Sequence, residues 1–137
     1  MLLHVERPET GERVRVNDPR FRRWAMTMVG HNAQEQLRVI YLDRRHRLLA
    51  DVLMAEGTVD EVACFPTELV HHALDLGASG FVVVHNHPSG DPTPTQADVA
   101  VTRKLAMAAT ALDLTLHDHV IVARNGFVSF RSRGLLR

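Results

Sequence analysis

The sequence predicts one α/β domain in which a mixed β-sheet packs against helices. Three observations lead to this fold class. The chain has 137 residues, 45% of them hydrophobic and 23% charged, which is the composition of a single globular domain. Helical and strand-like segments follow one another in the order helix, two strands, helix, strand, helix, two strands. One of these segments, 81–84, is a continuous apolar run, which is typical of a strand buried on both faces.

The N-terminal part of the chain predicts one helix after an irregular segment. Residues 1–18 show no sustained periodicity, so we expect a loose arm or a short extra strand there. Asp18 and Pro19 are typical of a helix N-cap and a first helical turn. Phe21 and Trp24 follow at helical spacing, and Gly30 is a residue that can end the helix.

The middle of the chain predicts a hairpin and then a second helix. Residues 37–42 are apolar and β-branched, 43–46 are polar turn residues, and 48–54 can return as a second strand. Pro66 begins a segment with apolar residues at helical spacing, and Gly77 ends it.

The last part of the chain places a proline-rich loop between a buried strand and a long helix. The strand covers 81–84, the loop 85–94 contains three prolines, and the helix covers about 95–112. Residues 120–122 and 127–130 flank an Asn-Gly pair, which is a strong signal for a tight β-hairpin turn.

Composition excludes several classes of protein. The 16 basic and 16 acidic side chains balance, so the chain lacks the basic excess of a non-specific nucleic-acid binder. No apolar run approaches the roughly 20 residues of a membrane span, and the N-terminus becomes charged too early for a signal peptide. The one cysteine, Cys64, cannot form an intramolecular disulfide and is expected to be a small buried residue. We therefore expect a cytoplasmic protein with no membrane partner.

The segment 85–98 contains the residues that can carry chemistry. His85 and His87 are two apart, so on an extended strand both imidazoles point to the same face and can converge on a metal ion. Asp98, about one turn into the next helix, can add a carboxylate ligand and leave a fourth position to water. Two structural alternatives remain open at this point. The histidines can be a polar strand end, and Thr95 with Asp98 has the spacing of a helix capping box.

The order His85, His87, Pro88, Thr95 and Asp98 resembles the JAMM motif of MPN+ metalloproteases, which is His-X-His-Pro, six residues, Ser or Thr, two residues, Asp. In particular, the chain resembles the RadC family, which carries His-Asn-His-Pro-Ser-Gly in this position. Residues 34–43, 57–58, 66–68, 118–119 and 128–130 follow in that family's order. The resemblance begins at about residue 29, so we divide the chain into an N-terminal arm and helix, 1–28, and a RadC-like JAMM/MPN domain, 29–137.

The resemblance implies an MPN/JAB-type, cytidine-deaminase-like fold and one zinc ion per chain, held by His85, His87 and Asp98. It also implies that Glu35, a glutamate opening an early strand, is the general base. From the residues alone, Glu56, Glu61 and Glu68 compete with it, although Glu68 suits the first turn of its helix and the other two suit loops. Thr95 stands where the family usually has a serine whose hydroxyl supports the oxyanion.

The function implied by this resemblance is that of a zinc-dependent metallopeptidase. It would hydrolyse an amide or isopeptide bond in a peptide substrate with a zinc-activated water. Two alternatives remain: an accessory protein linked to DNA repair, which the neutral charge does not favour, and a metal-binding interaction module without turnover. His119 is either a core histidine or a neighbour of the metal ligands.

Overall fold

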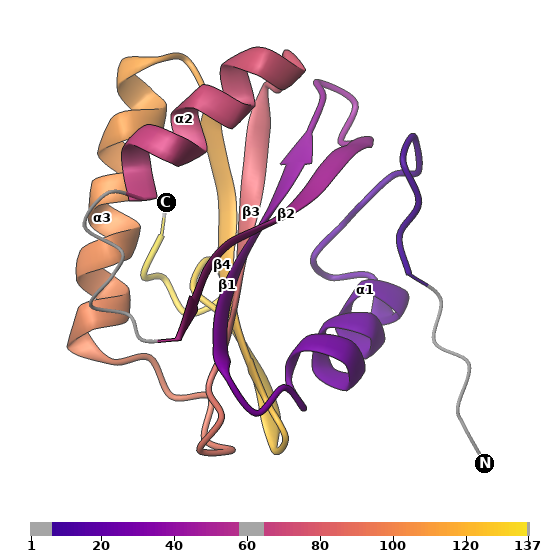
Figure 1. Cartoon of the computed structure of the whole chain (residues 1–137), viewed down its shortest axis with the longest axis vertical. Coiled ribbons are helices and arrows are strands. Elements are labelled where there is room, and N and C mark those ends of the chain that lie inside the picture. Colours follow the sequence, from indigo (N-terminus) through magenta and orange to yellow (C-terminus); the bar gives the residue numbers. More distant parts are fainter. Residues whose placement is uncertain (1–6, 58–64, 137) are drawn as a thin grey trace.

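A computed structural model of the chain describes residues 7–57 and 65–136. It contains one five-stranded sheet in the order β2-β1-β3-β4-β5, with helices on both faces (Figure 1). This arrangement confirms the predicted α/β fold class. The elements in chain order are α1 (Pro19–Trp24), the π-helical turn η1 (Ala25–Val29), β1 (Glu35–Leu42), β2 (Leu48–Gly57), α2 (Phe65–Leu76), β3 (Gly80–Asn86), α3 (Gln96–Ala111), β4 (Thr115–Ala123) and β5 (Gly126–Ser129).

The sheet is mixed because only one pair of neighbouring strands is parallel. β1 runs antiparallel to β2 and to β3, and β4 runs antiparallel to β5. β3 and β4 are parallel, so the chain must cross over between them, and α3 makes that connection. The crossover brings the start of α3 beside the end of β3. All seven residues of β3 are buried, as its apolar run predicted.

The alternation of side chains along the strands builds two hydrophobic cores, one on each face. Helices α2 and α3 cover one face, and α1 covers the other (Figure 1). The first core includes Leu37, Val39, Tyr41, Phe81, Val83 and Leu105. The second includes Phe21, Trp24, Ile40, Leu42, Val82 and Val84. His85 continues the alternation of Phe81 and Val83, so its imidazole faces the α2 and α3 side.

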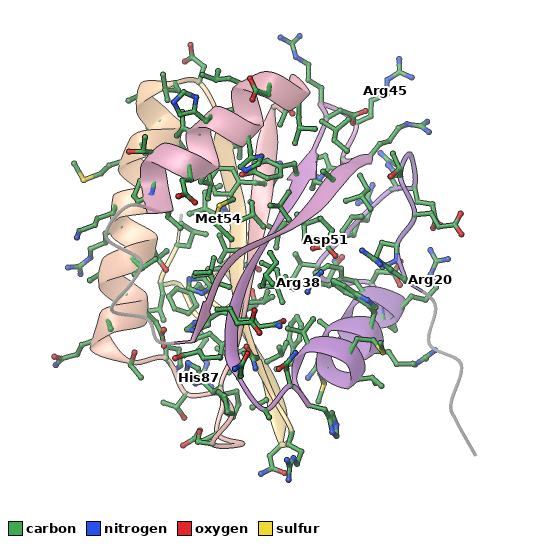
Figure 2. All side chains as sticks on the ribbon, in the orientation of Figure 1. Arg20, Arg38, Arg45, Asp51, Met54 and His87 are labelled. Carbon is green, nitrogen blue, oxygen red and sulfur yellow. The ribbon has the colours of Figure 1, made fainter. Side chains whose placement is uncertain are left out.

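The predicted hairpin of β1 and β2 is confirmed, and an ion pair joins its strands. Arg38 contacts both carboxylate oxygens of Asp51 at 3.1 Å, and the two side chains are labelled in Figure 2. The expectation that Glu56 lies in a loop is wrong, because it belongs to β2. In the N-terminal segment, Arg13 forms an isolated β-bridge with Arg47.

The first helix differs from its prediction. Asp18 caps it as expected, accepting a hydrogen bond from the Arg20 N–H at 2.9 Å. A continuous α-helix as far as Gly30 is wrong, because the backbone widens into η1 after Trp24. Gly30 closes this turn by donating to the Ala25 carbonyl at 2.9 Å. A Cβ at Gly30 would lie 2.6 Å from the Met26 carbonyl oxygen, so the turn needs glycine there. The division of the chain at residue 28 stays a prediction.

Strand β4 begins five residues before the predicted apolar run at 120–122. Its first half contains Thr115, His117, Asp118 and His119, which hide the alternation from a hydropathy reading. Asp118 and His119 are nevertheless buried. The register with β3 also shifts here, since Phe81 pairs with Leu116 while Val82 pairs with Asp118. The extra residue, His117, forms a β-bulge.

Candidate metal centre

Four predicted site residues meet where β3 ends. His85 is the penultimate residue of β3, and His87 follows the strand directly. Glu35 opens the neighbouring strand β1, and Asp98 lies in the first turn of α3. Figure 2 shows His87 at this end of the sheet, beside the loop that leads to α3. The strand pairing and the crossover therefore bring together residues that are up to 63 positions apart, from Glu35 to Asp98.

The side chains of these four residues are in direct contact. Each carboxylate oxygen of Asp98 faces one imidazole: Oδ1 lies 3.2 Å from His85 Nδ1, and Oδ2 lies 3.1 Å from His87 Nε2. Glu35 Oε1 lies 2.8 Å from His85 Nε2. Possible ligand atoms of Glu35, His85 and His87 all lie within 4.8 Å of one another. Both imidazoles can thus share an ion with Glu35, and Asp98 contacts one ring nitrogen of each histidine.

The loop after β3 fixes the protonation of His87. Its Nδ1 lies 2.9 Å from the backbone carbonyl of Asp91, and a carbonyl oxygen can only accept, so Nδ1 carries the hydrogen. In the neutral imidazole, Nε2 then presents a lone pair to Asp98 Oδ2. Such a hydrogen bond from the second ring nitrogen is the usual way in which proteins orient a metal-binding histidine. This contact could not be predicted from the residues, because any residue at position 91 has a carbonyl.

The same argument applies to His85. Its Nε2 donates to Glu35, so in the neutral ring Nδ1 has the lone pair. That Nδ1 is buried and makes no hydrogen bond within the part of the chain that the structure describes. With both rings neutral, Asp98 lies between two ring nitrogens that present lone pairs to it. A proton on a ring nitrogen, which then donates to Asp98, or a cation held by these atoms removes that repulsion.

The chemistry of this donor set fits a zinc ion. Two imidazole nitrogens and a carboxylate oxygen are ordinary zinc ligands, and bonds of about 2.0–2.1 Å at tetrahedral angles separate ligand atoms by roughly 3.3 Å. Asp98 contacts the two histidines through different oxygens, at 3.2 Å from His85 Nδ1 and 3.1 Å from His87 Nε2. Two carboxylate side chains in one cluster can balance the charge of a divalent cation. The Asp98 side chain is only 1% exposed.

The electrostatics favour an ionised Asp98. Burial alone would raise the pKa of Asp98, but the imidazoles of His85 and His87 and the Thr95 N–H hold that pKa well below its usual range. The carboxylate of Asp98 in turn raises the pKa of His87 against the opposing effect of burial. Asp98 is therefore available as an anionic ligand near pH 7.

Thr95 and Asp98 form the capping box that their spacing allows. The Thr95 hydroxyl accepts from the Asp98 N–H at 3.1 Å, and Asp98 Oδ2 accepts from the Thr95 N–H at 2.8 Å. Asp98 thus caps α3 and faces the two histidines with the same carboxylate, so the two interpretations of this residue are compatible. The Thr95 hydroxyl accepts in this bond and keeps its hydrogen for another acceptor. Its part in stabilising an oxyanion stays a prediction.

Asn86, which the sequence did not single out, ties Glu35 to the histidines. The amide oxygen of Asn86 accepts from the Gln36 N–H at 2.5 Å, and its amide nitrogen donates to the Gln34 carbonyl at 2.9 Å. These two bonds flank Glu35 on both sides and hold the start of β1 against the end of β3. Asn86 is fully buried. Its position between the two histidines was the signal that could have identified it.

His119 lies beneath the centre and is both a core residue and a neighbour of the histidines. Its ring stacks on Phe130 with 4.4 Å between centroids and lies 5.9 Å from the His85 ring. Thr102 donates to the Asp98 carbonyl at 2.8 Å and lies 2.6 Å from His119 Nδ1. Burial lowers the pKa of His119 to about 3, so the ring is neutral near pH 7.

The glutamates that competed with Glu35 are not part of this centre. Glu68 lies in the first turn of α2, as expected, and Glu56 is exposed on β2. Glu61 and Cys64 lie outside the described residues. Within the described residues, Glu35 is the glutamate in contact with a site histidine.

The mixed sheet with helices on both faces, and the His-X-His strand end beside the capped helix, define a JAB-type domain. The model of one family, the RadC-like JAB domain, matches residues 17–135. The chain therefore belongs to the RadC family, as its motifs indicated.

Two curated relatives have similar sequences. A UPF0758 protein from Rhodobacter capsulatus is 52% identical over 110 residues, which are 80% of this chain and 51% of the relative. A UPF0758 protein from Ruegeria pomeroyi is 50% identical over 110 residues, 80% of this chain and 49% of the relative. The chain thus spans about half the length of these relatives. Among the residues that the structure describes, no helix is both long and apolar enough to cross a membrane.

Proposed function

We propose that this domain is a zinc-dependent hydrolase of amide bonds in peptide or isopeptide substrates. One observation carries the proposal. The buried carboxylate of Asp98 lies 3.1–3.2 Å from a ring nitrogen of His87 and of His85, with a second carboxylate, Glu35, on the other side of His85. Three donors for one cation and a separate carboxylate for proton transfer are the parts that metal-assisted hydrolysis requires.

In this proposal His85, His87 and Asp98 hold the zinc ion. When bound, the ion supplies a Lewis acid that polarises the substrate carbonyl and lowers the pKa of a water molecule. The protein keeps these ligands in place through the Asp91 carbonyl on His87 and through the Thr95 N–H on Asp98. The MPN-type centre therefore has orienting partners behind two of its three ligands.

Glu35 is the general base in this proposal. Its side chain is 24% exposed, against 1% for Asp98, so it is the carboxylate of the centre that a water molecule and a substrate can reach. Oε1 takes a proton from the attacking water and transfers it to the leaving amine nitrogen. The Thr95 hydroxyl, held at the start of α3, donates to the oxyanion that develops on the substrate carbonyl.

Metal content is the first test, because it separates ligand from base. We expect one zinc per chain in the wild-type protein and in Glu35→Gln, and loss of stoichiometric zinc in Asp98→Asn and His87→Ala. His71→Ala is the matched control, since His71 is an exposed histidine of α2, and it should keep its zinc. If Asp98→Asn retains zinc and Glu35→Gln loses it, then Glu35 is the metal ligand and Asp98 is not.

Turnover is the second test. The probes are a pool of quenched fluorescent peptides and a peptide joined to a lysine side chain through an isopeptide bond. We expect hydrolysis by the zinc-loaded wild type and a fall of about two orders of magnitude or more in Glu35→Gln, the usual contribution of a general base. A zinc-loaded protein that cleaves neither probe would instead support the interaction module without turnover.

A further inference from the structure

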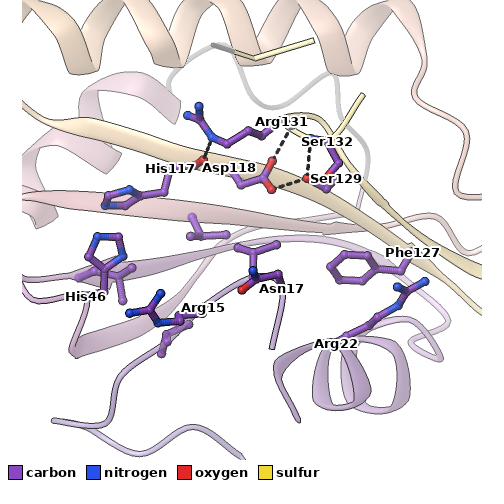
Figure 3. Close-up of a pocket in the computed structure, with 14 residues that line it drawn as sticks. Arg15, Asn17, Arg22, His46, His117, Asp118, Phe127, Ser129, Arg131 and Ser132 are labelled. Atoms are coloured by element: carbon purple, nitrogen blue, oxygen red, sulfur yellow. Dashed lines mark hydrogen bonds between the residues drawn. The ribbon is translucent and has the colours of Figure 1, made fainter. Parts of the chain in front are cut away.

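A second cavity lies on the opposite face of the sheet from the metal centre. It encloses about 580 Å³ between the sheet and the N-terminal segment that carries α1 (Figure 3). None of Glu35, His85, His87 and Asp98 lines it. Its volume lies within the range of about 300–1,000 Å³ that is typical of sites for small organic ligands.

Three arginines stand on the wall of this cavity, which we call the arginine pocket: Arg15, Arg22 and Arg131. Among its described lining residues, the one carboxylate is Asp118. Asp118 is buried and accepts from the Ser129 hydroxyl at 2.5 Å, the Arg131 N–H at 3.0 Å and the His119 N–H at 2.8 Å. The three guanidinium groups outnumber this one carboxylate, so the described lining has a positive charge.

The structure holds two of these guanidinium groups in place. Arg22 lies over the ring of Phe127, 4.9 Å from its centroid. Arg131 donates from Nε to the His117 carbonyl at 2.5 Å and from Nη2 to the Leu116 carbonyl at 3.1 Å. Figure 3 shows Arg15 and Arg22 on the N-terminal segment, on the opposite side of the pocket from Arg131. Fixed guanidinium groups lose little side-chain freedom when an anion binds.

Most of the other lining residues are apolar or aromatic, and Asn17, Ser129 and Ser132 are polar. Leu42, Val82 and Phe127 contribute apolar side chains, and His46 lies against His117 with 4.5 Å between ring centroids. The β-bulge at His117 and the missing side chain of Gly80 make room for that ring, since a Cβ there would lie 2.5 Å from His117 Nε2. Burial lowers the pKa of His117 to about 4, so its ring is a neutral surface near pH 7.

We propose that the arginine pocket binds a phosphorylated small molecule of nucleotide size. The guanidinium fork matches the oxygens of a phosphate monoester, and the apolar and imidazole surfaces suit a planar base. A phosphodiester strand carries the same phosphate chemistry. The observations favour the small ligand, because Arg15 and Arg22 line a recess instead of forming a ridge along the surface. The site is independent of the hydrolase proposed above.

Titration calorimetry with AMP, adenosine and inorganic phosphate tests this site. We expect AMP to bind and adenosine to bind at least about tenfold more weakly, since a charge-assisted contact is lost. Arg15→Gln and Arg22→Gln should each weaken AMP binding by about tenfold or more on the same basis. Arg23→Gln is the matched control: Arg23 is also exposed on α1 but does not line the pocket, so affinity should stay within about twofold.

Three outcomes would overturn the proposal. The first is no AMP binding at millimolar concentration. The second is an equal loss of affinity in Arg23→Gln and Arg15→Gln, which would indicate general surface electrostatics. The third is tighter binding of a short single-stranded DNA with equal sensitivity to Arg23, which would indicate a nucleic-acid surface. Zinc content and the unfolding midpoint of each variant are measured alongside, so failure of this site is distinguishable from failure of the metal centre or of folding.

Discussion

Asn86 shows how one buried side chain can set the geometry of the whole metal centre. Its amide bonds to the backbone on both sides of Glu35, while its own backbone separates the two histidines. Neither the charge nor the metal chemistry of the site explains an asparagine here. The requirement is for one acceptor and one donor in a fixed plane, which only an amide side chain supplies.

Asn86→Ala should therefore reduce both stability and the alignment of Glu35. The Gln36 N–H loses its partner in a buried place, which costs about 1–3 kcal/mol of unfolding free energy, and the part-buried bond to the Gln34 carbonyl is lost as well. Denaturant unfolding of the metal-free chain measures this, and zinc titration measures the effect on the centre. Gln96→Ala, at an exposed position of α3, is the control and should change neither. An unchanged unfolding free energy in Asn86→Ala would show that these bonds do not hold β1 to β3.

His119 predicts a pH dependence of stability with a definite sign. Burial lowers its pKa to about 3 in the folded chain, whereas an unfolded histidine has a pKa of about 6.5. Below about pH 6.5 the unfolded chain takes up a proton that the folded chain does not, so stability falls as the pH falls. The contribution is about 1.4 kcal/mol for each pH unit within that window.

Urea unfolding of the chelated protein at about pH 7 and about pH 5 measures this dependence. In His119→Gln, the unfolding free energy should fall less on acidification than in the wild type, because the contribution of His119 is absent. His71→Gln, which changes an exposed histidine, should keep the wild-type pH dependence. An identical pH dependence in wild type and His119→Gln would mean that His119 binds a proton equally well in both states.

At the scale of elements, the start of α3 performs two tasks with one pair of residues. The capping box satisfies backbone N–H groups of the helix and also aims Asp98 at the histidines. Because both tasks depend on Thr95, we expect its replacement to lower stability and turnover together, each by its own amount.

Thr95→Ala should lower the unfolding free energy by about 0.5–2 kcal/mol, the usual cost of losing a helix N-cap. Loss of an oxyanion donor would in addition reduce turnover by about 10²–10³. Thr95→Ser keeps the hydroxyl and is the control for both measurements. A stability loss without a fall in the turnover of zinc-loaded protein would restrict Thr95 to capping.

Sequence patterns located most elements because their apolar periods are unbroken. The runs in β1 and β3 and the cap of α3 were predictable from local residues alone. The start of β4 was not, because Asp118 and His119 are polar residues whose burial depends on partners elsewhere in the chain. The π-turn η1 was not predictable either, since its widened backbone follows from packing and not from a distinctive residue pattern.

The candidate site likewise contains residues that sequence spacing reveals and residues that only the folded structure reveals. The histidines, Asp98 and Thr95 are close in sequence, so their fixed spacing revealed them. Glu35 comes from another strand, and only the family resemblance distinguished it from the other glutamates. The contacts of Asn86 and of the Asp91 carbonyl depend on strand pairing and loop shape, which no spacing encodes.

At the scale of the whole molecule, one sheet separates two regions of different chemistry. The α2 and α3 face ends in a cluster of carboxylates and imidazoles that suits a cation. The α1 face holds the arginine pocket, which suits an anion. Each face has its own hydrophobic core, so each site rests on packing that does not depend on a bound ligand.

Chelation should therefore lower the stability of the zinc-loaded protein without unfolding it. A ligand that binds only the folded state stabilises it by about 2.7 kcal/mol when its free concentration is 100 times its Kd, and this is lost on chelation. For a chain of this size, we expect a fall of several degrees in Tm, on the order of 2–8 °C for each kcal/mol. Calorimetry of the zinc-loaded and chelated protein measures the shift, and circular dichroism shows whether the fold persists.

The control is Asp98→Asn, which lacks the proposed carboxylate ligand and should show the same Tm before and after chelation. Collapse of the wild-type fold on chelation would make the ion a structural one, because the two cores would then be insufficient without it. An equal Tm in loaded and chelated wild type would mean that zinc binds the folded chain no better than the unfolded one. Neither result is expected from a centre whose ligands are held by strand pairing, by a capped helix and by the Asp91 carbonyl.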